Sequence, residues 1–212
     1  MTNNKPIPNS FYRRREVHEY IERITEGLSL IYPHDGQVEM EWSAMLGEET
    51  LHYPWRRPFP RRMYAPIVDI AVGPFALHQQ HIQEYDILME QTSTFLDRLL
   101  MHHGHNLRFF DNFYNSPTVE QLKIANQNAR CLLAIELEKS NPDAKYLIGS
   151  AVNAAALGRI GIVVAWENTR LQHLLRIREY LQFLGELKKN VLDITNLLIL
   201  DKDQLLQAIE SA

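Results

Sequence analysis

At 212 residues, of which 45% are hydrophobic, the chain has the length of one ordinary domain and enough apolar side chains to fill a core. Its formal net charge of −4 argues against a protein that coats nucleic acid through bulk positive charge, although a local basic surface can still contact phosphates. The single cysteine rules out an internal disulfide, and the N-terminus has no apolar secretory signal. No apolar run approaches the roughly 20 residues that span a bilayer, so we expect a cytoplasmic protein with no membrane partner.

The first third of the sequence predicts a tail, a helix and a proline-rich loop. Residues 1–15 are polar or basic at most positions, and we expect them to form an N-terminal tail. Residues 16–31 carry apolar side chains at three- and four-residue spacing, which predicts an amphipathic helix that ends before Pro33. Residues 37–46 remain open between strand and helix. Residues 53–62 contain three prolines and predict a loop or irregular segment.

The middle of the sequence predicts one strand and then helices. Residues 67–72 form a β-branched run that stops at a Gly-Pro pair, which is typical of a strand. Apolar positions in residues 78–103 predict one long helix. A further helix follows Pro117, with Thr118 or Ser116 as its N-cap.

The last third predicts the most regular part of the fold. Residues 131–138 predict a strand, an alanine-rich helix follows and ends at Gly158, and residues 160–166 predict the next strand. Two strands joined by a helix are expected to be parallel, with a right-handed connection. A helix over 169–189, a short strand over 196–200 and a final helix with an Asp201–Gln204 capping box complete the α/β prediction.

Acidic side chains interrupt two of these apolar strands. Alternate side chains of a strand share a face, so Glu136 and Glu138 are expected on one side with their carboxylates about 7 Å apart. Leu133, Ile135 and Leu137 then point to the other side, against helices. Asp69 alternates in the same way with apolar neighbours in the strand over 67–72.

Gathered carboxylates favour a divalent cation. Two of them about 7 Å apart repel by roughly 2 kcal/mol at an effective dielectric of 20, and burial adds to that cost. A cation such as Mg²⁺ reverses the sign of this interaction, and it can polarise a phosphodiester and lower the pKa of an attacking water. The alternative is that these acids lie at the solvated edge of the sheet or pair with arginine.

The same residues carry a resemblance to a known family. Residues 64–74 and 134–140, followed by the helix over 143–158 and the strand over 159–166, resemble the PD-(D/E)XK nuclease superfamily. The resemblance implies a restriction-endonuclease-like fold, a mixed sheet flanked by helices. It also implies a single α/β domain over 16–212, with a helical insertion at about 78–129 on the periphery of the core.

The resemblance also implies an activity, which is metal-dependent hydrolysis of DNA with Mg²⁺ or Mn²⁺ as cofactor. Asp69 matches the first acid and Glu136 the second, and Glu138 stands where the family usually has lysine, as in E-x-E variants. Glu138 is then a third metal ligand or a general base. Lys145 is the candidate for a displaced catalytic lysine. Lys139 is less favoured because strand alternation turns it away from Glu136.

Two further expectations concern partners. Arg56, Arg57, Arg61 and Arg62 surround two aromatic side chains and could grip DNA phosphates, although a solvated surface is the alternative. Because the usual lysine is missing, the competing hypothesis for function is a catalytically degenerate module for binding or assembly. A homodimer is an option under either hypothesis.

Overall fold

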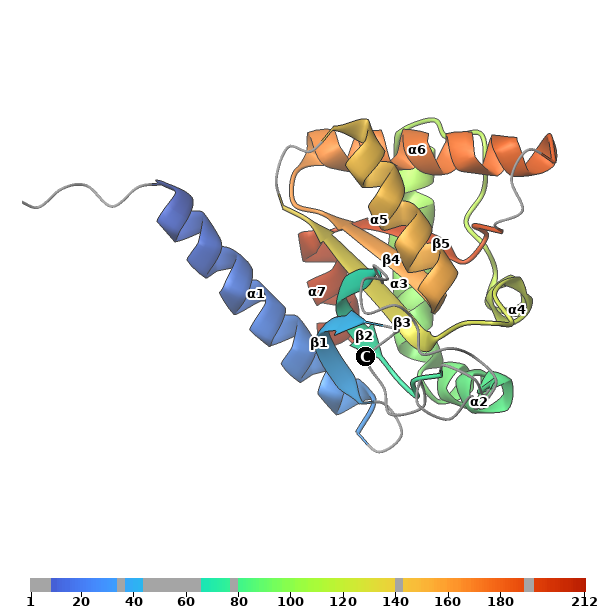
Figure 1. Ribbon diagram of the computed structural model, residues 1–212, viewed down its shortest axis with the longest axis horizontal. Coiled ribbons are helices and arrows are strands. Elements are labelled where there is room, and N and C mark those ends of the chain that lie inside the picture. The colour runs from blue at the N-terminus through green and yellow to red at the C-terminus, as the bar shows by residue number, and fades with distance from the viewer. Residues whose placement is uncertain (1–8, 34–36, 44–65, 77–79, 140–142, 189–192) are drawn as a thin grey trace, which may run out of the picture.

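Five strands form one mixed sheet, in the order β1-β2-β3-β4-β5, in the computed structural model (Figure 1). The strands are β1 (Val38–Ser43), β2 (Ile67–Val72), β3 (Cys131–Glu138), β4 (Gly158–Ala165) and β5 (Leu197–Asp201). The structure describes residues 9–33, 37–43, 66–76, 80–139, 143–188 and 193–212. The predicted strand bounds 67–72 and 131–138 are confirmed, and the open segment 37–46 contains a strand.

The sheet has an antiparallel half and a parallel half. β1 pairs antiparallel with β2, and β2 antiparallel with β3, whereas β3, β4 and β5 run parallel. The helix α5 (Ala144–Leu157) joins β3 to β4, which confirms the predicted strand–helix–strand unit. In this parallel half the carboxyl ends of β3, β4 and β5 therefore lie at the same edge of the sheet.

The remaining helices of the described residues are α1 (Asn9–Ile31), α2 (Ile82–Gln91), α3 (Ser93–Phe109), α4 (Val119–Ala125), α6 (Asn168–Glu186) and α7 (Lys202–Glu210). The predicted start of the first helix at residue 16 is wrong, since α1 begins at Asn9. The predicted helix over 78–103 is two helices that meet at Thr92. The buried Thr92 hydroxyl donates to the carbonyl of Leu88, one turn back, a bond that bends helices. None of the described helices is long and apolar enough to cross a membrane.

Helices cover both faces of the sheet (Figure 1). Side chains from α1, α2, α3, α4 and α7 form one core with β2, β3, β4 and β5, and those of α5 and α6 form a second core on the other side of β4 and β5. The described residues 80–129 of the predicted insertion over 78–129 are largely helical, but the predicted peripheral position is wrong. Tyr85, Met89, Phe95 and Leu99 of α2 and α3 are all buried in the first core.

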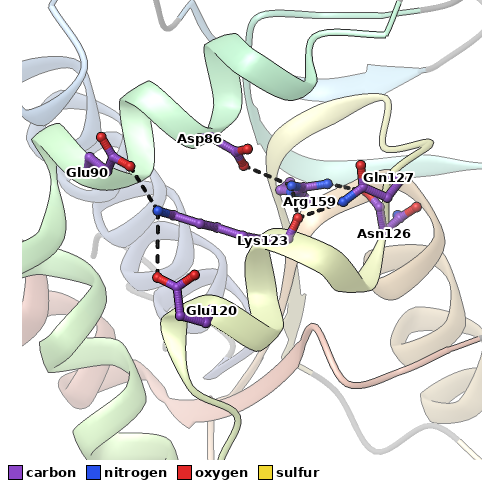
Figure 2. A network of polar contacts seen from close by, with 7 residues as sticks. All are labelled: Asp86, Glu90, Glu120, Lys123, Asn126, Gln127 and Arg159. Atoms are coloured by element: carbon purple, nitrogen blue, oxygen red, sulfur yellow. Dashed lines mark hydrogen bonds and ion pairs between the residues drawn. The ribbon is translucent and has the colours of Figure 1, made fainter.

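A buried arginine fixes the α2–α4 segment to the sheet (Figure 2). Arg159 of β4 is fully buried and donates to Asp86 of α2 at 2.8 Å. It also donates to the backbone carbonyls of Lys123 and Asn126, where α4 ends and its last carbonyls lack helical partners. Lys123 in turn donates to Glu90 of α2 at 2.9 Å. One guanidinium thus joins two helices to the strand that follows α5.

Side chains also protect the open edge of β5. His103 of α3 accepts the N–H of Ile199 through Nδ1 at 3.1 Å, and Asn106 donates to the Ile199 carbonyl at 3.1 Å. Arg178 of α6 donates to the Leu197 carbonyl at 3.0 Å. An unpaired strand edge invites association with other strands, and these contacts occupy it.

Close packing of α5 on the sheet depends on a glycine. A Cβ atom at Gly161 of β4 would lie 2.6 Å from the backbone of Ala154 in α5, a distance at which the two elements would have to separate. Glycine at this position lets α5 lie directly on the sheet, and this fixes the height of its side chains above β3.

Candidate functional site

The three predicted acids lie at neighbouring ends of β2 and β3. Asp69 is in β2, and Glu136 and Glu138 are in β3. The two strands pair antiparallel, and their register includes Ile70 with Ile135, the residues next to Asp69 and Glu136. The structure therefore brings Asp69 and Glu136 to adjacent positions on two paired strands, which sequence separation alone does not reveal.

Asp69 is held by two contacts with β3 and its end. Its Oδ2 accepts the backbone N–H of Leu137 at 2.7 Å, and its Oδ1 accepts the ammonium of Lys139 at 3.1 Å. The side chains of Asp69 and Lys139 are each 28% exposed, so this ion pair is partly shielded from water. The carboxylate is fixed in position at the margin of the site.

The two glutamates face α5. Asn153 of α5 hydrogen-bonds Glu136, and the Ser150 hydroxyl donates to Oε1 of Glu138. Both glutamates are 9% exposed. We expected helices on the opposite face of β3 only, but every residue of β3 is buried because helices cover both faces. The acids therefore lie beneath a helix.

Burial and like charge change the acidity of Glu136. Burial is the largest influence, and the carboxylates of Asp69 and Glu138 act in the same direction, so the pKa of Glu136 rises from 4.5 to about 8. The hydrogen bond from Asn153 and the positive charge of Lys139 partly oppose this increase. This shift favours the neutral carboxyl group near pH 7, and a nearby cation would favour its ionised form.

Lys139, and not Lys145, is the lysine that the structure places at the acids. Lys139 follows the last residue of β3, where strand alternation no longer fixes its direction, and its ammonium reaches Asp69. The sequence argument that turned Lys139 away from the site is therefore wrong. Lys145 is exposed, and its ammonium lies 5.1 Å from the ring centroid of its neighbour Tyr146.

The arrangement of the three acids suits a cation that is bound by only one or two protein side chains. Across the part of the chain that the structure describes, no three acidic, histidine or cysteine side chains are grouped to hold a metal ion. A closed three-acid cage is therefore not formed. Mg²⁺, however, is commonly bound through one or two carboxylates and several waters. The adjacent Asp69 and Glu136 fit that kind of site, and burial together with the charges of Asp69 and Glu138 raises the pKa of Glu136.

Sequence reasoning missed Ser150 and Asn153, and a spacing signal was available. They lie three residues apart on α5, so they share a helix face, as Glu136 and Glu138 share a strand face. Polar residues at this interval in an alanine-rich helix indicate a polar stripe facing polar partners. Arg56, Arg57, Arg61 and Arg62, the predicted phosphate contacts, lie outside the described residues.

Comparisons with known proteins identify no family for this chain. No family model matches the chain, and no curated protein or solved structure matches it.

Proposed function

We propose that the chain is a metal-dependent nuclease that hydrolyses DNA phosphodiesters, with a restriction-endonuclease-like core. The observation that carries the proposal is the buried Glu136, which has Asp69 beside it and Glu138 two residues along the same strand. Grouping carboxylates under a helix costs stability unless a bound cation offsets their repulsion.

The order of the elements supports the fold part of the proposal. A helix, α1, precedes three antiparallel strands, and α5 then leads to the parallel strand β4. The acids lie on β2 and β3, and α5 and β4 follow them in the order that the sequence resemblance implies. The α2–α4 segment between β2 and β3 is the part that the resemblance leaves as an insertion.

The side chains have distinct roles in this proposal. Asp69 and Glu136 would hold Mg²⁺ or Mn²⁺, which, when bound, polarises the phosphodiester and makes an attacking water more acidic. Glu138, oriented by Ser150, would accept the proton of that water. Asn153 orients Glu136.

Lys139 completes the proposed site. Its ammonium is already fixed beside Asp69, and a positive charge there would stabilise the extra negative charge of a phosphodiester under attack. We therefore assign to Lys139 the role that the sequence resemblance left to Lys145. The basic segment with Arg56, Arg57, Arg61 and Arg62 remains the proposed DNA contact.

Calorimetric titration with Mg²⁺ and with Mn²⁺ tests the cation site. The proposal expects saturable binding to the wild-type chain and its loss in Glu136→Gln, which keeps size and hydrogen bonding but cannot ionise. Glu39→Gln, at an exposed acid of β1, is the matched control and should bind as wild type. Equal binding by wild type and Glu136→Gln would contradict the site.

A binding or assembly module without catalysis is the second candidate, and one observation favours it. Leu137, Lys139, Ser150 and Asn153 already supply hydrogen bonds or charge to the three acids. Acids with such partners can persist without a metal. This candidate expects no heat of binding with either cation, and no cleavage of any DNA that the chain binds.

A further inference from the structure

An exposed aromatic stripe runs along the outer face of α6. Tyr180 and Phe183 are 52% and 48% exposed, and both lie in the middle of the stripe. Arg176 lies one turn before Tyr180 and Glu186 about one turn after Phe183, and both are exposed. Large aromatic side chains exposed together on one helix face are typical of a surface that binds another protein.

The stripe borders a preformed groove of about 520 Å³. Its opposite wall is formed by Phe113 and Tyr114, whose rings meet edge to face at 5.3 Å. The backbone N–H of Phe113 donates to Glu179 of α6 at 3.0 Å, so the wall is fixed to the helix. Phe113 itself is 81% exposed, so the groove has an apolar rim that no other described segment covers.

The charges on the stripe are complementary to the same stripe reversed. One end carries the positive Arg176 and the other the negative Glu186, with the two aromatic residues between them. Two groups of the same chain also contact acids here: Tyr114 hydrogen-bonds Glu186, and the N–H of Phe113 donates to Glu179. If a second α6 lies antiparallel, each Arg176 meets the partner copy's Glu186, and each Tyr180 meets the partner copy's Phe183. The midpoint between Arg176 and Glu186 and the midpoint between Tyr180 and Phe183 lie within about 1 Å of each other along the helix axis, because each residue advances the helix by about 1.5 Å. One twofold axis can therefore produce both pairings.

We propose that the outer face of α6 and the adjoining groove form a homodimer interface, in which two copies pair their α6 helices antiparallel about a twofold axis. In such an interface the same patch is used twice, and a residue that contacts a second residue is contacted by it in turn. The stripe meets this condition for both its charged and its aromatic residues. The inference stands whether or not the chain cleaves DNA.

Sedimentation velocity over a concentration series tests the proposal. The wild-type chain, with a monomer mass of 24.8 kDa, is expected to shift reversibly toward twice that mass at tens of micromolar. Phe183→Glu should weaken the dimer by about tenfold or more, because it buries two unpaired charges in the centre. Ile124→Glu, at an exposed apolar residue of α4, is the control and should associate as wild type.

A charge exchange gives the sharper readout. Arg176→Glu or Glu186→Arg alone places like charges opposite each other twice per dimer, and each should weaken association by about threefold to tenfold. The double variant R176E/E186R restores opposite pairs and should return association to near the wild-type value. A wild-type chain that stays monomeric, or a double variant weaker than both single variants, would overturn the proposal. A monomer whose DNA binding falls in Phe183→Glu would assign the groove to nucleic acid instead.

Discussion

The carboxylate of Asp69 accepts the backbone N–H of Leu137 at 2.7 Å, so a side chain takes the place of a main-chain carbonyl between β2 and β3. The contact lies next to the Ile70–Ile135 pair of the sheet register. The contact fixes Asp69, a proposed metal ligand, beside Glu136. It also connects Asp69 to the backbone of β3, the strand that carries Glu136 and Glu138. Asp69 therefore serves both the sheet and the site.

This dual role separates two substitutions at Asp69. Asp69→Asn keeps an oxygen for the Leu137 N–H, whereas Asp69→Ala leaves that donor without its acceptor. We expect Asp69→Ala to lower the free energy of unfolding by about 1–3 kcal/mol more than Asp69→Asn. Urea unfolding of both variants measures the difference. If the two variants are equally stable, the Leu137 contact is not what holds the strands here. Both variants should lose metal binding, and this outcome tests the ligand role independently.

Glu136 is expected to make stability depend on pH. Its pKa is raised to about 8 in the folded chain from 4.5, so the folded state binds more protons than the unfolded state between these values. The free energy of unfolding should therefore fall as pH rises from about 4.5 to about 8. Glu136→Gln lacks this contribution. Without metal, its free energy of unfolding relative to that of wild type should therefore rise by at least about 1 kcal/mol from about pH 5 to about pH 9.

Unfolding measurements at these two pH values, in EDTA, test the Glu136 prediction. The exposed Glu39→Gln is the control and should follow the wild-type pH profile. A Glu136→Gln profile parallel to wild type would show that the carboxyl is ionised normally and that neither burial nor its neighbours perturb it.

Strand patterns in the sequence predicted the scaffold of the site well. β-branched and apolar runs gave the bounds of β2 and β3, and the alternation of Glu136 with Leu137 placed both glutamates on one face. The alanine-rich segment that ends at Gly158 gave the helix of the parallel crossover. Periodicity reports which side of an element is apolar, and in these segments that signal is strong.

Tertiary contacts decided what the sequence left unpredicted. Periodicity does not report that a second helix layer covers the acid face, so the helix contacts of Glu136 and Glu138 were not predicted. Lys139 was misplaced because alternation was extended past the end of β3. The break at Thr92 follows from a side-chain hydrogen bond to Leu88 that apolar spacing does not encode.

The two lysines can be distinguished by their effect on cleavage. Lys139→Met should reduce the rate by the equivalent of about 2.7–4 kcal/mol, the scale for loss of one preorganised electrostatic group. Lys145→Met is the matched control at an exposed lysine of α5, and we expect it to cleave at nearly the wild-type rate. Single-turnover rates on one DNA substrate measure both. The reverse result would return the catalytic role to Lys145.

The Arg159 network is expected to serve stability and not chemistry. Arg159→Met removes a fully buried cation from Asp86 and from the carbonyls at the end of α4, and should lower the free energy of unfolding by about 2 kcal/mol or more. Asp86→Asn, at a residue 34% exposed on its side chain, should cost less than Arg159→Met. Thermal unfolding of both variants measures this order. An Arg159→Met protein as stable as wild type would contradict the role of this arginine as the joint between α2, α4 and β4.

Nicking of supercoiled plasmid DNA tests the central claim most directly. Wild-type chain should convert the plasmid to open-circle or linear form in Mg²⁺ or Mn²⁺, and EDTA should stop the reaction. Glu136→Gln and Glu138→Gln should each be inactive under the same conditions, while Glu39→Gln should cut as wild type. Cleavage that survives in EDTA, or a Glu136→Gln chain that nicks at the wild-type rate, would contradict the account.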